Sequence, residues 1–288
     1  IGDSNFDIEK QITIATRQSF KKIINEQTDY DPNLDYDMII VDENHHVSDL
    51  KGDYFQILSK LHAPLRFGLT ATLPDKEESK IACEGLIGPV IASLSIQEGN
   101  ELGIIAKPVI KLLRVPKNHA ISELRRYPDV YQEGVVENKI KNTMIIEKAK
   151  EHVLNGDSSL ILVSKIEHGT ILQEIGKEKG LSIIFIQGST ENDLRLQVKE
   201  ALDAKKIKCV IATAIWYEGI NIASLNVIIN AAGGKSEIRT IQTIGRGLRV
   251  TKDKKEVVIW DVFDPSNNFL ISHFGNRMCT YSEQGWIG

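Results

Sequence analysis

Short apolar runs alternate with segments of helical periodicity along nearly the whole chain. Residues 140–152 and 194–202 show the helical pattern well, and Ile140 and Leu194 are expected among their core-facing residues. Such alternation is typical of βα units, in which parallel strands pair in one sheet and helices cover its faces. The sequence therefore predicts an α/β fold built on parallel sheets.

The strand-like runs fall into two arrays. In the first, strands are expected at 12–15, 36–41, 65–69 and 90–94, with helices near 18–24, 54–61 and 77–83. In the second, strands are expected at 109–115, 159–163, 182–186, 208–212, 226–229 and 257–260. Two glycines and a proline within residues 98–108 separate the arrays, so we expect a domain boundary near Ala106 and domains of residues 1–106 and 107–288.

Composition excludes several classes of protein. The net charge of −4 argues against a general basic coat, so any nucleic-acid contact is expected to be local. The three cysteines are far apart and lack the spacing of a disulfide framework or a zinc site. Because there is no long apolar span and no signal segment, we expect a cytoplasmic protein without membrane contact. The first residue is Ile1 rather than methionine, so we also expect the chain to be the downstream part of a longer protein.

Two adjacent carboxylates follow the apolar run Met38–Val41. Functional groups of parallel sheets gather beyond the carboxyl ends of the strands, where Asp42 and Glu43 fall. In phosphoryl-transfer sites of this kind, one acidic residue holds Mg²⁺ and a neighbouring carboxylate orients or deprotonates the attacking water. An ordinary acidic turn after a strand fits the same residues equally well.

Two hydroxyl residues, Thr70 and Thr72, follow the next apolar run. Hydroxyls at a strand end can bond a carboxylate or a water that is bound to phosphate. Taken alone, however, the segment is more typical of a helix-entry loop in which Thr72 caps the helix and Pro74 lies near its first position.

Later in the chain, Gln242, Arg246 and Arg249 are spaced to share one face of a helix. Guanidinium groups at this spacing suit a triphosphate whose negative charge must be stabilised during transfer. A solvated basic helix face is the alternative. Gly245 and Gly247 argue against that alternative, because each glycine costs a surface helix about 1 kcal/mol.

A glycine-rich stretch at residues 233–236 resembles the end of a phosphate-binding loop. The loop pattern requires a glycine where Ile229 stands, so the sequence predicts no phosphate-binding loop there. Another apolar run ends at Thr213 and is followed by a turn with Gly219 and Asn221. Polar loops therefore follow several of the expected strands. Along the chain they carry first the acidic pair, then the hydroxyl residues and last the arginines.

In this order, the segments resemble the motifs of superfamily 2 helicases and translocases of the DExH type. The matching segments are 42–45 (motif II), 70–72 (motif III), 160–165 followed by His168 (motif IV), 187–189 with Arg195 (motif IVa), 212–221 (motif V) and 242–249 (motif VI). Residues 12–19 are similar to a backbone-contacting motif of the first domain, and residues 260–285 are similar to the end of the second domain in the UvsW-like and XPB-like branch.

The resemblance implies two RecA-like parallel-sheet domains in tandem, with the first one incomplete, and ATP and Mg²⁺ as cofactors. On this basis Asp42 binds the metal, Glu43 activates water, and Arg246 and Arg249 reach the γ-phosphate. The resemblance also implies that His45 and Gln242 sense domain closure, and that His45, Gly219 and Asn221 contact the nucleotide. Thr70 and Thr72 would couple the nucleotide site to the face that binds nucleic acid. The residues implied to contact the nucleic-acid backbone are Thr16, Gln18, Ser164, Gly188 and Thr213.

Two departures from the family pattern stand out. Asn221 occupies a position that is Asp in many relatives, so a contact with the ribose would lack charge. Motif I, the phosphate-binding loop, is absent from these residues, so we expect little or no ATP hydrolysis from this chain by itself.

The expected function is the motor core of an ATP-dependent DNA helicase or translocase that unwinds or remodels branched DNA. An RNA helicase, the motor subunit of a restriction system and a catalytically silent module that binds nucleic acid remain as alternatives. Intact acidic and arginine motifs argue against the silent module.

Overall fold

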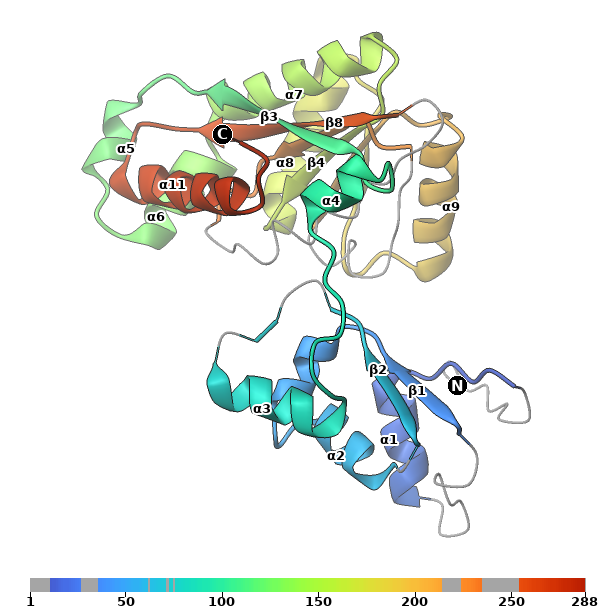
Figure 1. Ribbon diagram of the computed structural model, residues 1–288. Coiled ribbons are helices and arrows are strands. Elements are labelled where there is room, and N and C mark those ends of the chain that lie inside the picture. The colour runs from blue at the N-terminus through green and yellow to red at the C-terminus, as the bar shows by residue number, and fades with distance from the viewer. Residues whose placement is uncertain are drawn as a thin grey trace. The chain divides into compact units, whose positions relative to one another are not determined.

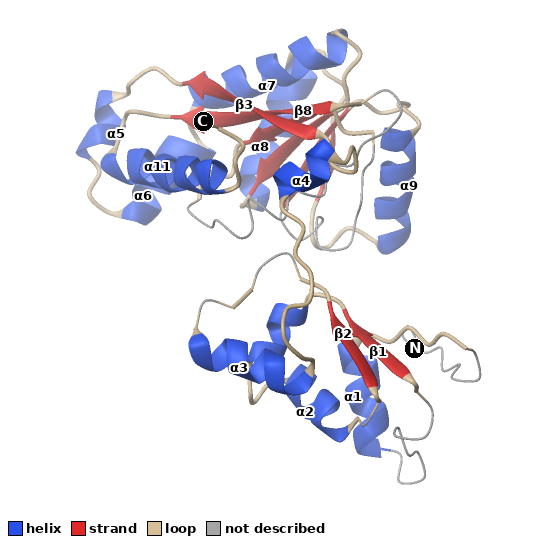
Figure 2. Cartoon of the chain, viewed as in Figure 1, coloured by secondary structure: helices blue, strands red, loops and turns tan. Residues whose placement is uncertain are grey.

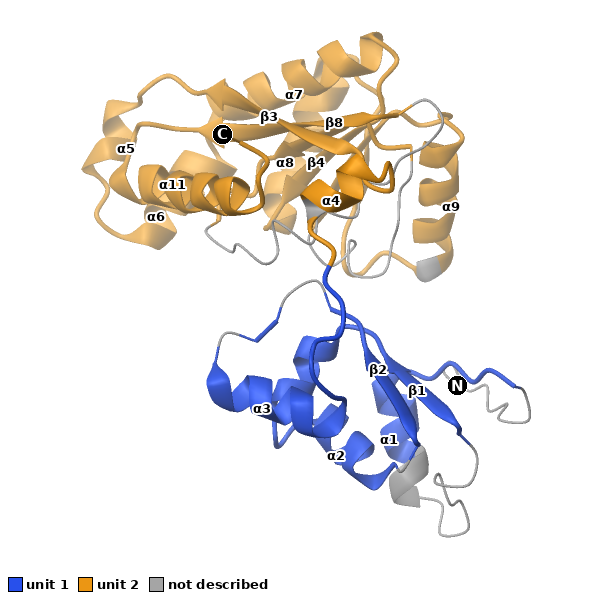
Figure 3. Cartoon of the chain, in the orientation of Figure 1, with its two compact units in different colours: residues 1–93 blue, residues 94–288 orange. Residues whose placement is uncertain are grey.

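The computed structural model (Figure 1) describes residues 11–26, 36–61, 63–70, 73–74, 76–213, 224–234 and 254–287. Helices and strands alternate along the chain, as the sequence predicts (Figure 2). The chain divides into two compact units, Ile1–Ser93 and Leu94–Gly288 (Figure 3). This division lies earlier than the boundary near Ala106 expected from the glycines and the proline, and that boundary stays a prediction.

The first unit contains a two-stranded parallel sheet in its described part. Strands β1 (Met38–Val41) and β2 (Leu65–Gly68) pair in register, with Val41 opposite Gly68. The accompanying helices are α1 (Arg17–Glu26), the 3-10 turn η1 (Asn44–Ser48), α2 (Asp53–Lys60) and α3 (Glu77–Leu86). Their core consists of Val41, Val47, Ile57, Leu58, Leu61 and Cys83. Alternate residues of both strands, such as Ile40 and Phe67, are exposed.

The second unit is built on a six-stranded parallel sheet. The strand order is β3-β8-β7-β4-β6-β5, and every neighbouring pair runs parallel. The strands are β3 (Lys107–Arg114), β4 (Ser159–Val163), β5 (Ile184–Ile186), β6 (Cys209–Thr213), β7 (Val227–Asn230) and β8 (Glu256–Phe263). The helices are α4 (Ile96–Glu101), α5 (His119–Glu123), α6 (Tyr127–Tyr131), the π-helical turn η2 (Gln132–Val136), α7 (Lys139–Leu154), α8 (Ile166–Glu178), α9 (Asn192–Asp203) and α11 (Asn268–Glu283).

Alternate residues of the central strands enter two separate cores. Leu160 and Leu162 of β4 pack into a core that contains Val198 and Leu202 of α9 and Tyr281 of α11. The intervening β4 residues pack into the opposite core, whose members include residues of α7 and α8. Since side chains of a strand point alternately to its two faces, the sheet is covered on both sides. All five residues of β4 are consequently buried.

Three short helical elements, α5, α6 and η2, lie between β3 and α7 along the chain. Together they form a helical block that packs with α11 (Figure 1). The small core of this block consists of Ile121, Val130, Tyr131, Val135, Val136 and Leu270. The apolar periodicity in this stretch is short and broken, so the sequence pattern does not predict these elements. Their position matters because Tyr131 reaches the carboxyl edge of the sheet.

The predicted elements agree with the observed ones over most of the described chain, but two predicted strands are wrong. Residues 12–15 and 90–94 are apolar, yet they form no strand. An apolar run becomes a strand only where a neighbouring strand offers hydrogen bonds, and neither segment pairs with one among the described residues. Ile140 and Leu194 were expected in the core and are instead exposed, because α7 and α9 present other residues to the sheet.

Candidate nucleotide and nucleic-acid sites

The carboxylate pair lies immediately beyond β1. The Leu69 N–H donates to the Val41 carbonyl at 2.9 Å, and the Asn44 N–H donates to the Leu69 carbonyl at 2.9 Å. These bonds continue the pairing of the two strands into their loops. Glu43 adopts a left-handed conformation with φ 52°, which turns the chain sharply after the strand. Asp42 is exposed, and its Oδ1 accepts the Glu43 N–H at 3.0 Å.

His45 joins this loop to the loop that follows β2. Its Nδ1 lies 3.0 Å from the Thr70 hydroxyl and 3.4 Å from a carboxylate oxygen of Glu43. Burial lowers the pKa of His45, and His46 lowers it further, while Glu43 opposes the shift. The imidazole is therefore predominantly neutral at pH 7. Residues that the sequence assigned to motifs II and III are thus in direct contact.

Mg²⁺ fits this site as a metal held by a single carboxylate. The described residues include no group of three or more acidic, histidine or cysteine side chains that could enclose a metal. Mg²⁺ commonly binds proteins through one or two carboxylates and completes its shell with phosphate oxygens and water. Exposed Asp42 at a strand end satisfies that requirement.

Thr16 and Gln18 are both exposed near the start of α1. The Thr16 hydroxyl accepts the Ser19 N–H at 3.3 Å and donates to the Ser19 hydroxyl at 2.9 Å. This geometry caps the helix, because the side chain satisfies an N–H group of the first turn. Thr16 therefore has a structural role in addition to the predicted contact with nucleic acid.

Three residues predicted to contact nucleic acid lie at one edge of the second sheet. Thr213 ends β6, and its neighbour across the sheet is Val163, the last residue of β4. Ser164 directly follows β4 and is exposed. Gly188 lies two residues beyond β5, which pairs with the other side of β6. The sheet thus brings Ser164, Thr213 and Gly188 to the carboxyl ends of three adjacent strands.

Hydrogen bonds shape the loop that contains Gly188. The Arg195 guanidinium on α9 donates to the Gly188 carbonyl and, at 3.4 Å, to the Gln187 carbonyl. The Thr190 hydroxyl accepts the Gln187 N–H at 3.1 Å. Arg195 therefore orients this loop. In the sequence, Arg195 was identified only through the resemblance to motif IVa.

Thr213 differs from its neighbours because its hydroxyl is buried. Its Oγ1 has no hydrogen-bond partner within the part of the chain that the structure describes. A buried hydroxyl is normally bonded, since leaving it unpaired costs free energy. A ligand bound at this end of the strand would give the Thr213 hydroxyl a hydrogen-bond partner.

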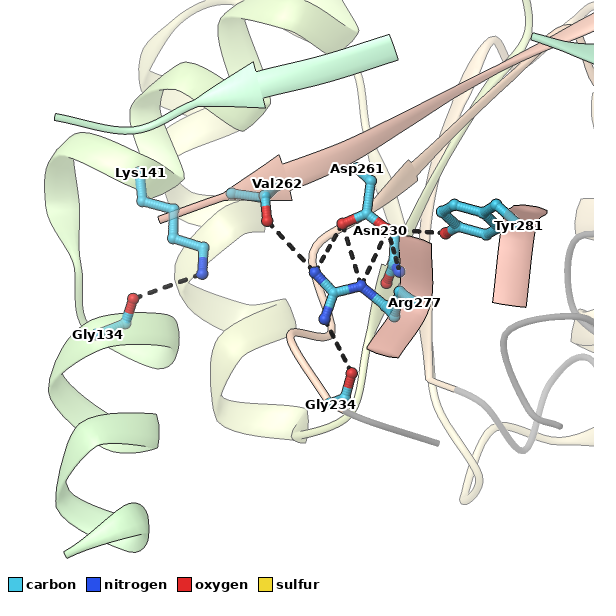
Figure 4. Close-up of polar contacts among 8 residues, drawn as sticks. All are labelled: Gly134, Lys141, Asn230, Gly234, Asp261, Val262, Arg277 and Tyr281. Carbon is cyan, nitrogen blue, oxygen red and sulfur yellow. Dashed lines mark hydrogen bonds and ion pairs between the residues drawn. The ribbon is translucent and has the colours of Figure 1, made fainter. Parts of the chain in front are cut away.

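The second unit also contains a buried polar network (Figure 4). The Arg277 guanidinium on α11 donates to both carboxylate oxygens of Asp261 on β8, with the closest distance 2.7 Å, and to the Gly234 carbonyl at 2.9 Å. The Tyr281 hydroxyl donates to Asp261 at 2.7 Å. Burial opposes the charge on Arg277, and contact with Asp261 outweighs this effect and raises the pKa of Arg277. Asp261, Arg277 and Tyr281 belong to the stretch 260–285 that resembles the end of the second domain in the UvsW-like and XPB-like branch, but the resemblance predicted no contact among them.

A second polar cluster is buried between α7 and α8. The His168 Nε2 lies 2.9 Å from Asn142 Oδ1, while Asn142 Nδ2 donates to the Val136 carbonyl at 2.8 Å. Because the amide nitrogen of Asn142 is already directed at a carbonyl, its oxygen accepts and His168 carries the proton on Nε2. Burial, with a smaller contribution from Lys141, lowers the pKa of His168 to about 3. Burial also lowers the pKa of Lys141 to about 8.

Several predicted site residues lie outside the described residues. They are Thr72, Gly219, Asn221, Gln242, Arg246 and Arg249. Their roles stay predictions, as do those of Asp42, Glu43 and the nucleic-acid contacts. Among the described residues, no helix combines the length and the apolar character that crossing a membrane would require.

Two family profiles match successive parts of the chain. Residues 2–75 match "Type III restriction enzyme, res subunit", and residues 140–251 match "Helicase conserved C-terminal domain". A protein described provisionally as helicase 22, from Sulfolobus islandicus filamentous virus, is 28% identical over 81% of this chain and 44% of the relative. The ATP-dependent DNA helicase uvsW of Enterobacteria phage T4 is 23% identical over 76% of this chain and 47% of the relative. The chain thus spans less than half the length of these relatives.

Solved structures share the fold. Dbp5 of S. cerevisiae, bound to RNA and ADP BeF3, matches with a TM-score of 0.65 and 17% identity, over 99% of this chain and 67% of that chain. The similarity extends across both units, in agreement with the predicted pair of RecA-like parallel-sheet domains in tandem. The two profile matches and the helicase relatives, together with this fold, support assignment of the chain to the superfamily 2 helicases.

Proposed function

We propose that this chain is the motor core of an ATP-dependent DNA helicase or translocase that unwinds or remodels branched DNA. The observation that carries the proposal is the contact between the loops after β1 and β2, in which His45 connects the carboxylate pair to Thr70. Through His45, a nucleotide bound beside Asp42 and Glu43 would be connected to the loop that follows β2. A motor protein needs such a connection, because a change at the nucleotide must reach other parts of the domain.

On the nucleotide side, Asp42 would hold Mg²⁺ and Glu43 would orient or deprotonate the attacking water. Mg²⁺ would supply charge stabilisation on the transferring phosphate. Gly219 and Asn221 would contact the nucleotide, and Arg246 and Arg249 would stabilise negative charge on the γ-phosphate, with Gln242 sensing the bound state. The phosphate-binding loop is not among these residues, so we expect little hydrolysis from this chain alone.

On the nucleic-acid side, Ser164, Gly188 and Thr213 support contact with a phosphodiester backbone. Hydroxyl groups and main-chain N–H groups at one sheet edge can bind phosphates without reading sequence. This type of contact is compatible with a net charge of −4, because it needs no large basic surface. Thr16 and Gln18, in the first unit, would also contact a nucleic-acid backbone.

The role of Glu43 is tested by Glu43→Gln in the complete natural protein. Loss of the carboxylate should abolish nucleic-acid-stimulated ATP hydrolysis while a fluorescent ATP analogue still binds, because the amide keeps the shape but cannot accept a proton. The matched control is Glu77→Gln, an exposed glutamate on α3 of the same unit. Unchanged turnover in Glu43→Gln would show that the assignment of the base is wrong.

A second experiment separates DNA from RNA and from a silent module. ATP hydrolysis by the complete natural protein is measured with single-stranded DNA, forked DNA and single-stranded RNA of equal length. The proposal expects the greatest stimulation by forked DNA. Greater stimulation by RNA would favour the RNA-helicase alternative, for which the Dbp5 structure bound to RNA is the relevant likeness. No stimulation by any of the three, at any salt concentration, would favour the silent module.

A further inference from the structure

Lys165 lies at the carboxyl edge of the second sheet, immediately after Ser164. It is exposed and occupies the position before α8, whose first residue is Ile166. Its ammonium donates to Gln132 Oε1 at 2.9 Å and lies 5.2 Å from the centroid of the Tyr131 ring. Both partners belong to the helical block between β3 and α7. Two contacts therefore fix the direction of an exposed lysine side chain.

The Tyr131 ring locates this ammonium along the sheet edge. The ring is buried, and its hydroxyl donates to the carbonyl of Ala232, which follows β7, at 2.7 Å. Strand β7 pairs with one side of β4, and β6 pairs with the other side. Gly188, Thr213 and Ser164 follow β5, β6 and β4, which are successive strands of the sheet. The ammonium of Lys165 therefore continues this row of residues toward β7.

The described partners of the ammonium are neutral. An amide oxygen and the face of a phenol ring attract a cation without cancelling its charge. Gln132 Oε1 occupies one of the three donors that an ammonium carries. Lys179, by contrast, contacts the carboxylate of Glu147 at 2.9 Å. Within the described part of the chain, no ion pair has to break before Lys165 bonds an anion.

Two glutamates share the amide that holds the lysine. Gln132 Nε2 donates to Glu137 at 2.8 Å and to both carboxylate oxygens of Glu167 at 3.1 Å. Because the amide nitrogen is directed at the carboxylates, the amide oxygen is left to accept from the ammonium. Gln132 therefore orients the lysine without neutralising it.

We infer that Lys165 is a cationic contact for the phosphodiester backbone of a nucleic-acid strand, and that Gln132 positions its ammonium. The inference rests on the proposed function, and it adds a charged contact to the uncharged groups of Ser164, Gly188 and Thr213. A lysine binds phosphate as a point charge, so the contact would not select a base. One positioned cation is also compatible with the net charge of −4.

Lys165→Met tests the contact, because it removes the charge and keeps a long side chain. Binding of a fluorescein-labelled oligo(dT) of about 20 nucleotides to the complete natural protein is measured by fluorescence anisotropy, from about 50 to about 200 mM NaCl. The affinity should fall about three- to tenfold at about 100 mM NaCl. The slope of log affinity against log salt concentration should become shallower by about 0.7, the change for one lost contact with a single strand.

Lys177→Met is the matched control, since Lys177 is an exposed lysine at the opposite end of the same helix. It removes the same charge, and it should leave both the affinity and the salt slope unchanged. Equal effects of the two variants would overturn the inference, because they would reflect net charge alone. An affinity of Lys165→Met within about twofold of the unsubstituted protein would also overturn it. A weaker affinity with an unchanged salt slope would do the same, since it would show a structural role for Lys165.

Gln132→Met tests the positioning role, because it removes the amide without adding charge. It should weaken binding about two- to fivefold in the unsubstituted protein. In the Lys165→Met background it should have almost no effect, since the side chain that it positions is gone. Gln97→Met, which changes an exposed glutamine that also donates to a glutamate, should bind normally in both backgrounds. Multiplied effects of Gln132→Met and Lys165→Met would show that Gln132 does not act through the lysine.

Failure of the proposed function gives a different result from failure of this inference. An unsubstituted protein that binds no oligo(dT) at any salt concentration contradicts the proposed function and the role of Lys165 with it. An unsubstituted protein that binds oligo(dT), with Lys165→Met binding equally well, contradicts the role of Lys165 alone.

Discussion

Gly68 packs so closely against Asn44 that a β-carbon at position 68 would lie 2.5 Å from the Asn44 amide group. Gly68 is the last residue of β2, and Asn44 follows the carboxylate pair after β1. The main chain of Asn44 is fixed by its hydrogen bond to the Leu69 carbonyl, so the asparagine has limited freedom to move away. The absence of a side chain at Gly68 therefore lets the loop with Asp42 and Glu43 lie close to the neighbouring strand.

Gly68→Ala is expected to destabilise the protein by about 1–3 kcal/mol, the usual cost of overpacking a close contact. In the complete natural protein, it should also lower ATP hydrolysis, because the loop with Glu43 must shift. Urea unfolding followed by circular dichroism measures the first effect. Gly85→Ala is the matched control: it lies in α3 with open space around its α-carbon, and alanine there should stabilise by up to about 1 kcal/mol. Equal free energies of unfolding for the two variants would contradict the prediction.

The loops after β1 and β2 could be predicted from the sequence, because the prediction of each loop needs only the residues of its own segment. An apolar run predicts a strand, and a parallel sheet collects the residues that follow its strands at one edge. On this basis the sequence predicts Glu43 and Thr70 as site residues, which the structure links through His45, and Ser164 and Thr213, which the structure brings to adjacent strand ends.

Residues 12–15 and 90–94 show the limit of that rule. Their apolar character predicted strands, but pairing depends on a neighbour that a single segment does not encode. The contacts of Tyr131 with Ala232 and of Arg277 with Asp261 join residues far apart in the chain, with separations of 101 and 16 positions. Sequence spacing carries no signal for the first of these. Both residues of the second contact lie in the stretch 260–285 that resembles the end of the second domain, but the resemblance did not predict that they pair.

His168 should make the protein sensitive to acid. Its pKa is lowered to about 3 by burial, whereas an unfolded chain takes up this proton near pH 6.5. Between these values the unfolded state binds more protons, so stability falls as pH decreases, by up to about 1.4 kcal/mol per pH unit. The contribution is fully present above pH 6.5 and is lost as pH falls toward 3.

His168→Gln should therefore reduce the loss of stability between pH 7.5 and pH 4.5 by about 3 kcal/mol. Urea unfolding at both values provides the measurement, and only the difference between the two pH values is compared, because the substitution also changes packing. His119→Gln, on the exposed surface of α5, is the matched control, because it makes the same substitution outside the buried cluster. The prediction is wrong if the two variants lose equal stability on acidification.

Arg277→Met should destabilise the second unit by about 3–5 kcal/mol, because it leaves the fully buried Asp261 carboxylate without its cationic partner. The change can be followed by fluorescence of Trp260 and Trp286, which lie in this unit. Adding Asp261→Asn should recover part of the loss by removing the unpaired charge. Arg126→Met, which removes an exposed ion pair, should cost less than about 1 kcal/mol. Absence of any recovery in the double variant would count against charge burial as the cause.

Thr213→Val tests whether the buried hydroxyl at the end of β6 serves nucleic-acid binding rather than the fold. Valine has nearly the same shape, so it removes the oxygen and leaves the packing of the strand intact. Because the Thr213 hydroxyl lacks a partner among the described residues, the substitution should leave the free energy of unfolding unchanged or raise it by about 1 kcal/mol. Binding of oligo(dT) should weaken about fivefold, the effect of one lost hydrogen bond.

Ser159→Ala is the matched control, since the Ser159 hydroxyl is also buried without a described partner but lies at the opposite end of the adjacent strand β4. If both variants weaken binding equally, or if Thr213→Val binds normally, the hydroxyl of Thr213 does not contact the nucleic acid.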